Sequence, residues 1–243
     1  MIFFFKKSKL IVDFFTTRPD AYKYSPIDYA HKFYPDWWKK TSPSYENGFV
    51  KRPTIKSCNG IIDSYKKGFI IPLWSDLVFQ VNNKNISWNF ADDLSQCNFH
   101  NYQQWQSYAD MSKYYHLKIE SPWIARCKEN VNFYFTKPFW NHPLGEPYEI
   151  LSGVLNFKYN DATNIQMMID IQKDYIYNLK ALTPMIHAIP FTDKELLIKN
   201  HLVDDLEMKK IKNHRLKTFF NNYAKSMNIS KKLESKCPFH FLK

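Results

Sequence analysis

Residues 68–90 read GFIIPLWSDLVFQVNNKNISWNF, and this stretch decides the expected fold class. The apolar run over 68–81 is rich in β-branched and aromatic residues, which favour strands, and Pro72 interrupts it. We therefore expect two short strands or one kinked edge strand here. The polar residues 82–85 predict a hairpin loop, and residues 86–90 predict the strand that returns from it.

The same β pattern continues on both sides of this stretch. Residues 9–15 (KLIVDFF) predict a first strand because β-branched and aromatic side chains dominate them. Strands at such short spacing imply a mainly β fold, which we expect to be a jelly roll, a sandwich or a β-clip-like barrel. Apolar or alternating segments between polar turns predict further strands at 131–136, 149–159, 165–171, 175–179 and 185–189.

A short helix is expected near the N-terminus. Ser25 and Pro26 predict its start, because serine caps helices and proline suits the first helical position. Pro35 is expected to end it. The following residues 36–48, rich in Ser, Pro, Asn and Lys, are expected to form a loop.

A basic amphipathic helix is predicted for the C-terminal part of the chain. Thr192 and Glu195 form a capping box, and helix-compatible sequence continues to about residue 227 without Pro or Gly. Leu202 and Leu206, one turn apart, begin an apolar stripe beneath a basic face. We therefore divide the chain into a β-rich domain over residues 1–192 and a basic helical tail over residues 193–243.

The formal net charge of +11 is concentrated in this tail. Residues 208–243 contain ten Lys or Arg and one acidic residue, whereas the rest of the chain contains 24 basic and 22 acidic side chains. Such a one-sided segment is typical of a contact with nucleic acid or an acidic protein. The alternative is a solvated helix face that docks back on the β domain. The candidate contact residues are Lys209, Lys210, Lys212, Arg215 and Lys217.

The sequence predicts an intracellular protein without a membrane span. No segment approaches the roughly 20 apolar residues that cross a bilayer. The N-terminal residues MIFFFKK place their charges after a short apolar run, which is the reverse of a secretory signal. Cysteines at positions 58, 97, 127 and 237 are widely spread, and we expect free thiols.

Local catalytic motifs are absent from the sequence. It contains no GxxxxGK[ST] phosphate loop, no GxGxxG dinucleotide fingerprint and no GxSxG nucleophile elbow. No histidine is followed two residues later by Asp, Glu or His, which removes the local half of the usual two-histidine, one-carboxylate iron site. The sequence therefore identifies no cofactor and no metal site, and it leaves open whether the protein is an enzyme.

Five segments together carry a resemblance to a known group of proteins. They are TIKSCNGIID at 54–63, KGFIIPLWSD at 67–76, ESPW at 120–123, SGVLN at 152–156 and TPMIHAIP at 183–190. In this order they resemble an uncharacterised protein family encoded by tailed phages of marine bacteria, over about residues 50–192. The resemblance implies a phage origin, a compact β fold, and a place in the host cytoplasm or the virion.

A second, local likeness concerns nucleotide enzymes. Residues 153–159 (GVLNFKY) are similar to the Gly-x-x-Asp-x-x-Tyr stretch of the dUTPase and dCTP deaminase β-barrel. In that family the Asp orients water and the Tyr packs on the deoxyribose, which would give Tyr159 the second role. Asn156 stands in place of the Asp, and an amide is no general base near neutral pH.

Five further side chains are candidates for a ligand site. Trp74 and Asp76 lie two residues apart on one strand face and could form a pocket wall. The alternative is a core tryptophan beside an aspartate that caps a turn. Trp123 could line a ligand site or belong to the core. His187 is expected to be a hydrogen-bonded core histidine rather than a ligand, and His142, in a loop, is the better candidate for a surface contact.

Two functions follow from these patterns. The first is a non-enzymatic binding or structural protein whose basic tail contacts nucleic acid or an acidic partner; it could also assemble as a homo-oligomer. The alternative is an enzyme that acts on a small metabolite or nucleotide inside the barrel, with any metal held by histidines from separate strands. The enzyme hypothesis predicts that His142, His187, Asp76 and Tyr159 converge on one concave site.

Overall fold

The computed structural model describes residues 8–105, 108 and 110–213 of the chain. Strands predominate in this part, so the mainly β class predicted from the sequence is confirmed. The strands form five hydrogen-bonded sheets, and no sheet in the described ranges closes on itself. The barrel version of the prediction is therefore wrong, while a jelly roll or sandwich stays a prediction.

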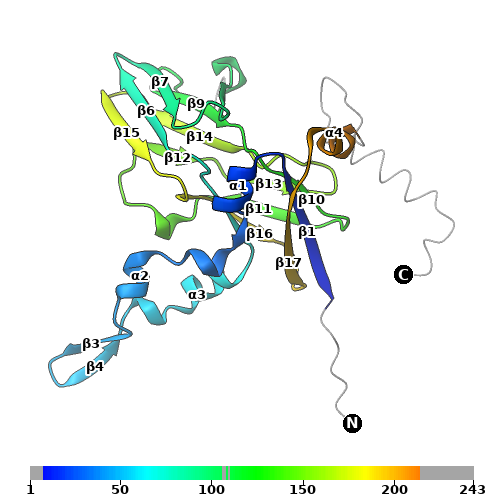
Figure 1. The fold of residues 1–243 in the computed structure, drawn as a ribbon. Coiled ribbons are helices and arrows are strands. Elements are labelled where there is room, and N and C mark those ends of the chain that lie inside the picture. Colours follow the sequence, from blue (N-terminus) through cyan, green and yellow to red (C-terminus); the bar gives the residue numbers. More distant parts are fainter. Residues whose placement is uncertain (1–7, 106–107, 109, 214–243) are drawn as a thin grey trace, which may run out of the picture.

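Four sheets make up the body of the molecule, and a two-stranded hairpin stands apart from it (Figure 1). One body sheet has the order β10 (Ile124–Arg126), β1 (Lys9–Thr16), β17 (Glu195–Leu202). The next is β13 (Gly153–Asn156), β11 (Asn132–Thr136), β16 (Pro184–Pro190), β5 (Phe69–Pro72), β2 (Asp28–Tyr29). The others are β12 (Tyr148–Ile150), β14 (Ile165–Asp170), β9 (Tyr114–Ile119), β8 (Cys97–Phe99), and β15 (Tyr175–Leu179), β6 (Leu77–Asn82), β7 (Asn85–Phe90).

The helices are short. The α-helices are α1 (Pro19–Tyr24), α2 (Asp36–Lys40), α3 (Asn59–Lys66) and α4 (Asp205–Asn213). The 3-10 turns are η1 (Ala30–Phe33), η2 (Ile55–Ser57), η3 (Tyr102–Trp105) and η4 (Phe139–Asn141). None of the helices described is long and apolar enough to cross a membrane. Cys58, Cys97 and Cys127 are free thiols, as expected, and Cys237 lies outside the described residues.

One large core holds the body together. It contains side chains from all four body sheets, and aromatic rings fill its centre. The rings of Phe14 and Phe69 meet edge to face with centroids 5.0 Å apart, and those of Phe133 and Phe157 lie 4.8 Å apart. Aromatic pairs at these distances add to the stabilisation that burial of apolar surface provides. Much of the high aromatic content therefore serves packing.

The hairpin predicted around residues 82–85 is confirmed. Pro72 ends β5, and β6 begins at Leu77, so the apolar run forms two strands. Asn83 and Lys84 join β6 to β7 with φ values of 48° and 62°. A two-residue turn with both central residues at positive φ is of type I′, which matches the twist of the flanking strands.

The helix predicted to begin at Thr192 is wrong. Residues Glu195–Leu202 form β17, which pairs in parallel with β1 along eight residues. The parallel partner lies far away in the sequence, and Leu196 and Ile198 pack against the main core. Thr192 caps a local turn instead, since its Oγ1 accepts from the Lys194 backbone N–H at 3.3 Å.

A helix begins 13 residues later. Asp204 caps α4, since its Oδ1 accepts from the Glu207 backbone N–H at 2.7 Å. Leu202 and Leu206, predicted to lie beneath the basic face, are exposed, so this part of the stripe is wrong. Met208 and Ile211 are the buried residues of α4, and they pack against Ile124. The predicted continuation of the helix to residue 227 lies outside the described residues.

The predicted helix start at Ser25 and Pro26 is also wrong. α1 ends there, and it begins with Pro19 at its first turn. The Ser25 backbone N–H and Oγ both donate to the carbonyl of Ala21, so serine closes the helix instead of opening it. Pro26 follows, as is common just after a helix end.

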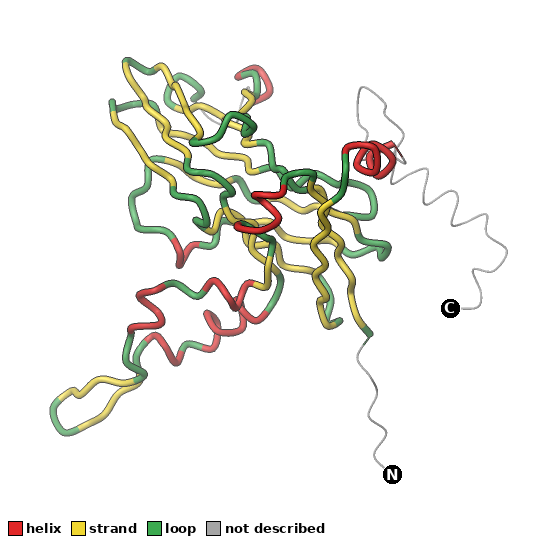
Figure 2. Tube along the Cα trace, in the orientation of Figure 1, coloured by secondary structure: helices red, strands yellow, loops and turns green. Residues whose placement is uncertain are grey.

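Residues 30–68 form a projection that we call the arm (Figures 1 and 2). It contains η1, α2, the hairpin of β3 (Ser44–Asn47) and β4 (Val50–Pro53), η2 and α3. The expected loop at 36–48 is therefore only partly irregular. A second, smaller core lies at the base of the arm, where Trp38, Ile61 and Tyr65 pack with Ile70 of β5.

Candidate functional site

The arm is fixed to the body by a set of hydrogen bonds at its base. Asn141 of η4 joins two parts of the arm: its Nδ2 donates to the carbonyl of Phe33 at 2.8 Å, and its Oδ1 accepts from the hydroxyl of Tyr65. The indole Nε1 of Trp37 donates to the carbonyl of Trp140 at 2.8 Å. The base of the arm is therefore positioned by directional contacts as well as by packing.

His187 belongs to the same junction. Its Nε2 donates to the carbonyl of Lys67 at 2.8 Å, and its ring lies 5.9 Å from that of Tyr65. Burial lowers the pKa of the imidazole, which favours the neutral ring. The structure thus places His187 as a hydrogen-bonded core histidine that holds the end of α3, in agreement with the expectation from its apolar strand.

Gly68 lets the chain turn back from the arm into β5. Its φ is +78°, and a Cβ at this position would lie 2.0 Å from the carbonyl oxygen of Ala188. No other residue type fits such a close backbone approach. The Gly68 carbonyl accepts from the backbone N–H of Ala30 at 3.2 Å, so the first and last residues of the arm meet here.

Among the described residues, none buries the hairpin at the far end of the arm. Every residue of β4 and all but Ser44 of β3 are exposed. Gly48 and Phe49 form the two-residue turn, and Gly48 has a φ of +63°. Glycine at the first central position is typical of a type II′ turn, so local sequence explains why the chain reverses here. The side chain of Phe49 is fully exposed at the tip.

Among the described residues, positive charge is concentrated in the arm. Residues 30–68 contain eight Lys or Arg and three Asp or Glu, a net charge of +5. The rest of the described chain, residues 8–29 and 69–213, contains 17 basic and 19 acidic side chains, a net charge of −2. The basic residues of the arm are Lys32, Lys39, Lys40, Lys51, Arg52, Lys56, Lys66 and Lys67.

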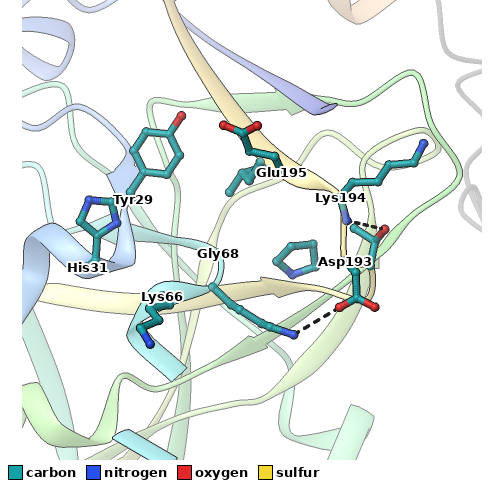
Figure 3. A pocket seen from close by; sticks show the side chains of 11 residues that line it. Tyr29, His31, Lys66, Gly68, Asp193, Lys194 and Glu195 are labelled. Atoms are coloured by element: carbon teal, nitrogen blue, oxygen red, sulfur yellow. Dashed lines mark hydrogen bonds and ion pairs between the residues drawn. The ribbon is translucent and has the colours of Figure 1, made fainter. Parts of the chain in front are cut away.

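A cleft of about 650 Å³ lies at the base of the arm (Figure 3). Tyr29 and His31 line one side, and Asp193 and Lys194 line the other. Lys66, the last residue of α3, and Lys67, which follows it, complete its rim together with Glu195. The cleft therefore joins the basic surface of the arm to the loop between β16 and β17.

The lysines of the cleft form exposed ion pairs. Lys67 Nζ lies 3.6 Å from Asp193 Oδ1, and Lys66 Nζ lies 3.1 Å from Asp63 Oδ1. Lys194 pairs with Glu129. Exposed pairs of this kind contribute only about 0–1 kcal/mol, so an anionic ligand can replace the carboxylates at little cost.

His142 does not reach the surface, contrary to the expectation for a loop residue. Its side chain is 2% exposed, and its Nε2 donates to the carbonyl of Pro184 at 2.7 Å. Its Nδ1 lies 3.0 Å from Glu146 Oε2, which also pairs with Lys137 at 2.9 Å. Glu146 Oε1 accepts from Tyr177 at 2.8 Å and from Tyr148 at 3.1 Å.

Glu146 is the centre of this network. Burial alone would raise the pKa of its carboxyl, but hydrogen bonds from His142 and Lys137 lower it to about 2. Burial raises the pKa of the Tyr148 hydroxyl, and the neighbouring carboxylate raises it further. Each polar group has a partner inside the network, so the cluster joins the loop around η4 to β16 and β15.

Trp74 and Asp76 take the structural roles considered above. Trp74 is buried in the core, and its Nε1 donates to the hydroxyl of Ser95 at 2.9 Å. Asp76 Oδ1 accepts from the backbone N–H of Ala181 at 2.7 Å, and its Oδ2 accepts from Lys180 at 2.9 Å. These bonds lower the pKa of the Asp76 carboxyl. Both residues lie in the connection between β5 and β6, so the predicted shared strand face is wrong, and neither lines the cleft at the base of the arm.

Asn156 is the last residue of β13, and Tyr159 lies in the turn that follows it. The side chain of Asn156 donates to Asn130 at 2.8 Å and to Asn132 at 3.0 Å, while its Oδ1 accepts from the Lys158 backbone N–H at 3.1 Å. Tyr159 is buried, as is Trp123 in the main core. The Tyr159 hydroxyl and the Trp123 Nε1 have no hydrogen-bond partner among the described residues.

The lysines predicted in the tail fall into two groups. Lys209, Lys210 and Lys212 lie on the exposed side of α4, whose other side docks on the body through Met208 and Ile211. Arg215 and Lys217 lie outside the described residues. α4 and the arm lie on opposite sides of the body in Figure 1, so they are separate basic surfaces.

One pair of histidines that lie together in the structure was not predicted from the sequence. His100 and His116 stack with ring centroids 4.3 Å apart beside a cavity of about 280 Å³. Trp105 Nε1 donates to His116 Nδ1 at 3.1 Å, and His116 Nε2 donates to Gln166 Oε1 at 2.9 Å. Burial lowers the pKa of His116 to about 4, and His100 contributes. His116 is thus a neutral, hydrogen-bonded part of the fold.

The residues expected to converge in an enzyme do not share a cavity among the three that we describe. The third of these, about 230 Å³ beside β13, is lined by none of His142, His187, Asp76 or Tyr159. Within residues 8–105, 108 and 110–213, no group of three His, Cys, Asp or Glu side chains lies close enough to hold a metal ion.

Comparison with known proteins adds no relative to this picture. The chain matches no protein-family model, no curated protein and no solved structure. The site therefore has to be interpreted from its own geometry and charge.

Proposed function

We propose that this chain is a non-enzymatic nucleic-acid-binding protein whose main contact surface is the arm and the cleft at its base. The observation that carries the proposal is the separation of charge: a net +5 on residues 30–68 and a net −2 on the rest of the described chain. A local excess of Lys and Arg attracts a phosphate backbone and releases its counterions.

The placement of the basic residues supports the same proposal. Lys39, Lys40, Lys51 and Arg52 are exposed along the arm and Lys56 is half-buried, and Lys66 and Lys67 continue the basic surface into the cleft. Trp37, Tyr45 and Phe49 expose aromatic surface among them. Cations for phosphates and aromatic rings for bases are the two elements that nucleic-acid-binding surfaces combine.

The tail extends this proposal to a second surface. Lys209, Lys210 and Lys212 face solvent on α4, and the sequence beyond residue 213 continues with Arg215 and Lys217. An acidic protein partner remains the second candidate for this surface, because charge alone attracts both.

The enzyme hypothesis has less support. It requires His142, His187, Asp76 and Tyr159 to converge, yet the first three have partners in separate hydrogen-bonded clusters. Tyr159 is buried in its own turn. A nucleotide enzyme of the dUTPase type would also have to replace the missing carboxylate at Asn156.

We also propose a sandwich-like scaffold of phage origin that acts in the host cytoplasm or the virion. The single core shared by the four body sheets supports the scaffold, and the five resembling segments support the origin. A homo-oligomer is part of this proposal, and a native mass spectrum of the full-length protein tests it.

The proposal is tested by fluorescence anisotropy with labelled DNA and RNA over a series of NaCl concentrations. We expect binding at low salt that weakens steeply as salt rises. Replacing Lys39, Lys40, Lys51 and Arg52 with Ser should lower the magnitude of the salt slope by up to about 4, since each lost phosphate contact removes about 0.9.

A matched control removes four exposed lysines from the body. Lys23, Lys84, Lys113 and Lys173 are exposed and lie outside the arm, so their replacement with Ser lowers the net charge by four, as the arm variant does. We expect a smaller change in the slope. The proposal is wrong if the wild-type protein binds neither DNA nor RNA at low ionic strength, or if the two variants behave alike.

A further inference from the structure

We propose that the β3–β4 hairpin enters the major groove of double-stranded DNA, where Phe49 at its tip makes an apolar contact with thymine methyl groups. The inference rests on the proposed function and deepens it by naming the nucleic acid and the element that reads it. It concerns residues 44–53, which project furthest from the body in Figures 1 and 2.

The shape of the hairpin fits this groove. It is a two-stranded ribbon of four residues per strand with a two-residue turn. Strands of this length extend about 14 Å at roughly 3.4 Å per residue. The major groove of B-DNA is about 12 Å wide and 8.5 Å deep and admits a two-stranded ribbon, so the tip can reach its floor.

The hairpin is not packed against the rest of the described chain. An isolated two-stranded hairpin is at best marginally stable in water, and this one has almost all of its side chains in solvent. The side chain of Phe49 is fully exposed, and Val50 is 53% exposed. Apolar side chains on a projecting ribbon are typical of surfaces that become buried on binding.

The two faces of the ribbon differ in chemistry. Tyr45 pairs with Arg52, and Asn47 pairs with Val50, so these four side chains share one face. On the other face Glu46 lies opposite Lys51. Arg and Asn are the side chains that contact guanine and adenine edges in the major groove, which makes the face with Arg52 and Asn47 the one that reads bases.

The base of the hairpin supplies cations for the phosphates on either side of the groove. Lys39 and Lys40 end α2, and Lys56 lies in η2, with its Nζ 3.0 Å from the carbonyl of Lys39. These three residues are exposed or half-buried and lie where the ribbon leaves the arm. Phosphate contacts fix the register, while the ribbon contacts the bases.

Duplex DNA is favoured over RNA for a geometric reason. The major groove of an A-form RNA helix is too deep and narrow for protein side chains to read. Single strands have no groove, so a ribbon offers them only its exposed rings. The inference therefore predicts the order of affinity duplex DNA, then single-stranded DNA and duplex RNA.

The test measures anisotropy with the full-length protein, a thymine-containing DNA duplex of about 20 base pairs, the same duplex with uracil in place of thymine, and the matching single strand and duplex RNA. Wild-type binding should be weaker to the uracil duplex, because the thymine methyl group that Phe49 contacts is missing. Phe49→Ser should weaken binding to the thymine duplex roughly tenfold and should bind the two duplexes alike.

Two control variants make the result specific. Ile176→Ser removes an exposed apolar side chain from β15 on the body and should change neither the affinity for the thymine duplex nor its preference over the uracil duplex. Arg52→Lys keeps the charge and loses the bidentate contact, so it should reduce the preference among duplex sequences while leaving the salt slope unchanged.

The outcomes separate the inference from the function on which it rests. If Phe49→Ser binds duplex DNA as the wild type does, or if the wild type prefers single strands, the groove inference fails and nucleic-acid binding stands. If no nucleic acid binds at low salt, both fail. If Phe49→Ser instead dissociates an oligomer of this chain in a native mass spectrum, the hairpin is a protein-binding element and the inference is overturned.

Discussion

The body and the arm use similar amino acids for opposite purposes. In the body, aromatic rings such as Phe14 and Phe133 pack in one core, and ionisable side chains such as Glu146 form hydrogen bonds with neighbouring side chains. In the arm, Trp38 and Tyr65 build only a small core, while Phe49 and most cations remain in solvent. The aromatic and lysine-rich composition therefore has no single meaning, and position decides which residues are free to bind.

The largest expected effect concerns the junction between the two regions. Gly68→Ala should destabilise the protein by about 3–5 kcal/mol, because the new Cβ meets the backbone of Ala188 and the residue keeps a positive φ. Urea unfolding followed by tryptophan fluorescence measures it. Gly145→Ala is the matched control: its φ is +81°, but its Cβ enters open space, so a cost of about 1–2 kcal/mol is expected. Equal costs at the two positions would contradict the close approach.

The next prediction separates the arm from the body. Asn141→Ala leaves the carbonyl of Phe33 and the hydroxyl of Tyr65 without their partner, at a cost of about 1–3 kcal/mol. Hydrogen exchange should become faster in η1 and α3, while β6 and β9 stay protected. Exchange that rises equally in β6 and β9 would show that the arm and the body unfold as one unit.

A third prediction concerns the stability of the body at acidic pH. The pKa of Glu146 is about 2 in the folded protein and near 4.5 when unfolded, so its stabilising effect is complete above about pH 5 and is lost as pH falls towards 2. The expected loss is about 1–2 kcal/mol after allowance for solvent screening. Unfolding free energies at pH 7, 5 and 3 measure it.

Glu146→Gln supplies the control for this pH dependence. The amide keeps the shape of the side chain and removes the charge that Lys137 and His142 contact. The variant should be less stable than the wild type at pH 7 and should lose less stability between pH 5 and 3. A parallel loss in both proteins would assign the acid sensitivity to other groups, such as Asp92, whose pKa is also about 2.

Turn residues close together in the sequence made some of the fold predictable. Strands that pair with distant segments could not be predicted. Asn83 and Lys84 specify their turn within a few residues, so the β6–β7 hairpin could be predicted. β17 could not, because its strand partner β1 lies far away in the sequence and its capping residues suggest a helix. Tertiary pairing outweighs local preference in such a segment.

The candidate site shows the same limit. The charge of the arm is visible in the sequence only if the segment 30–68 is counted by itself, and nothing local marks its ends. They are defined by contacts such as Ala30 with Gly68 and His187 with Lys67. The tail, by contrast, could be recognised as basic because its Lys and Arg residues cluster in the one segment 208–243, although the predicted helix start at Thr192 was wrong.

The smallest expected effect tests whether the tail or the arm dominates nucleic-acid binding. Replacing Lys209, Lys210 and Lys212 with Ser should leave stability within about 0.5 kcal/mol, because these side chains are exposed while Met208 and Ile211 hold α4 on the body. If α4 contributes phosphate contacts, the salt slope falls by up to about 3. Since α4 and the arm lie on opposite sides of the body, one short duplex cannot span both, and we expect the arm variant to have the larger effect on a duplex of about 10 base pairs. A larger effect of the α4 variant would reverse the comparison and make the tail the main contact.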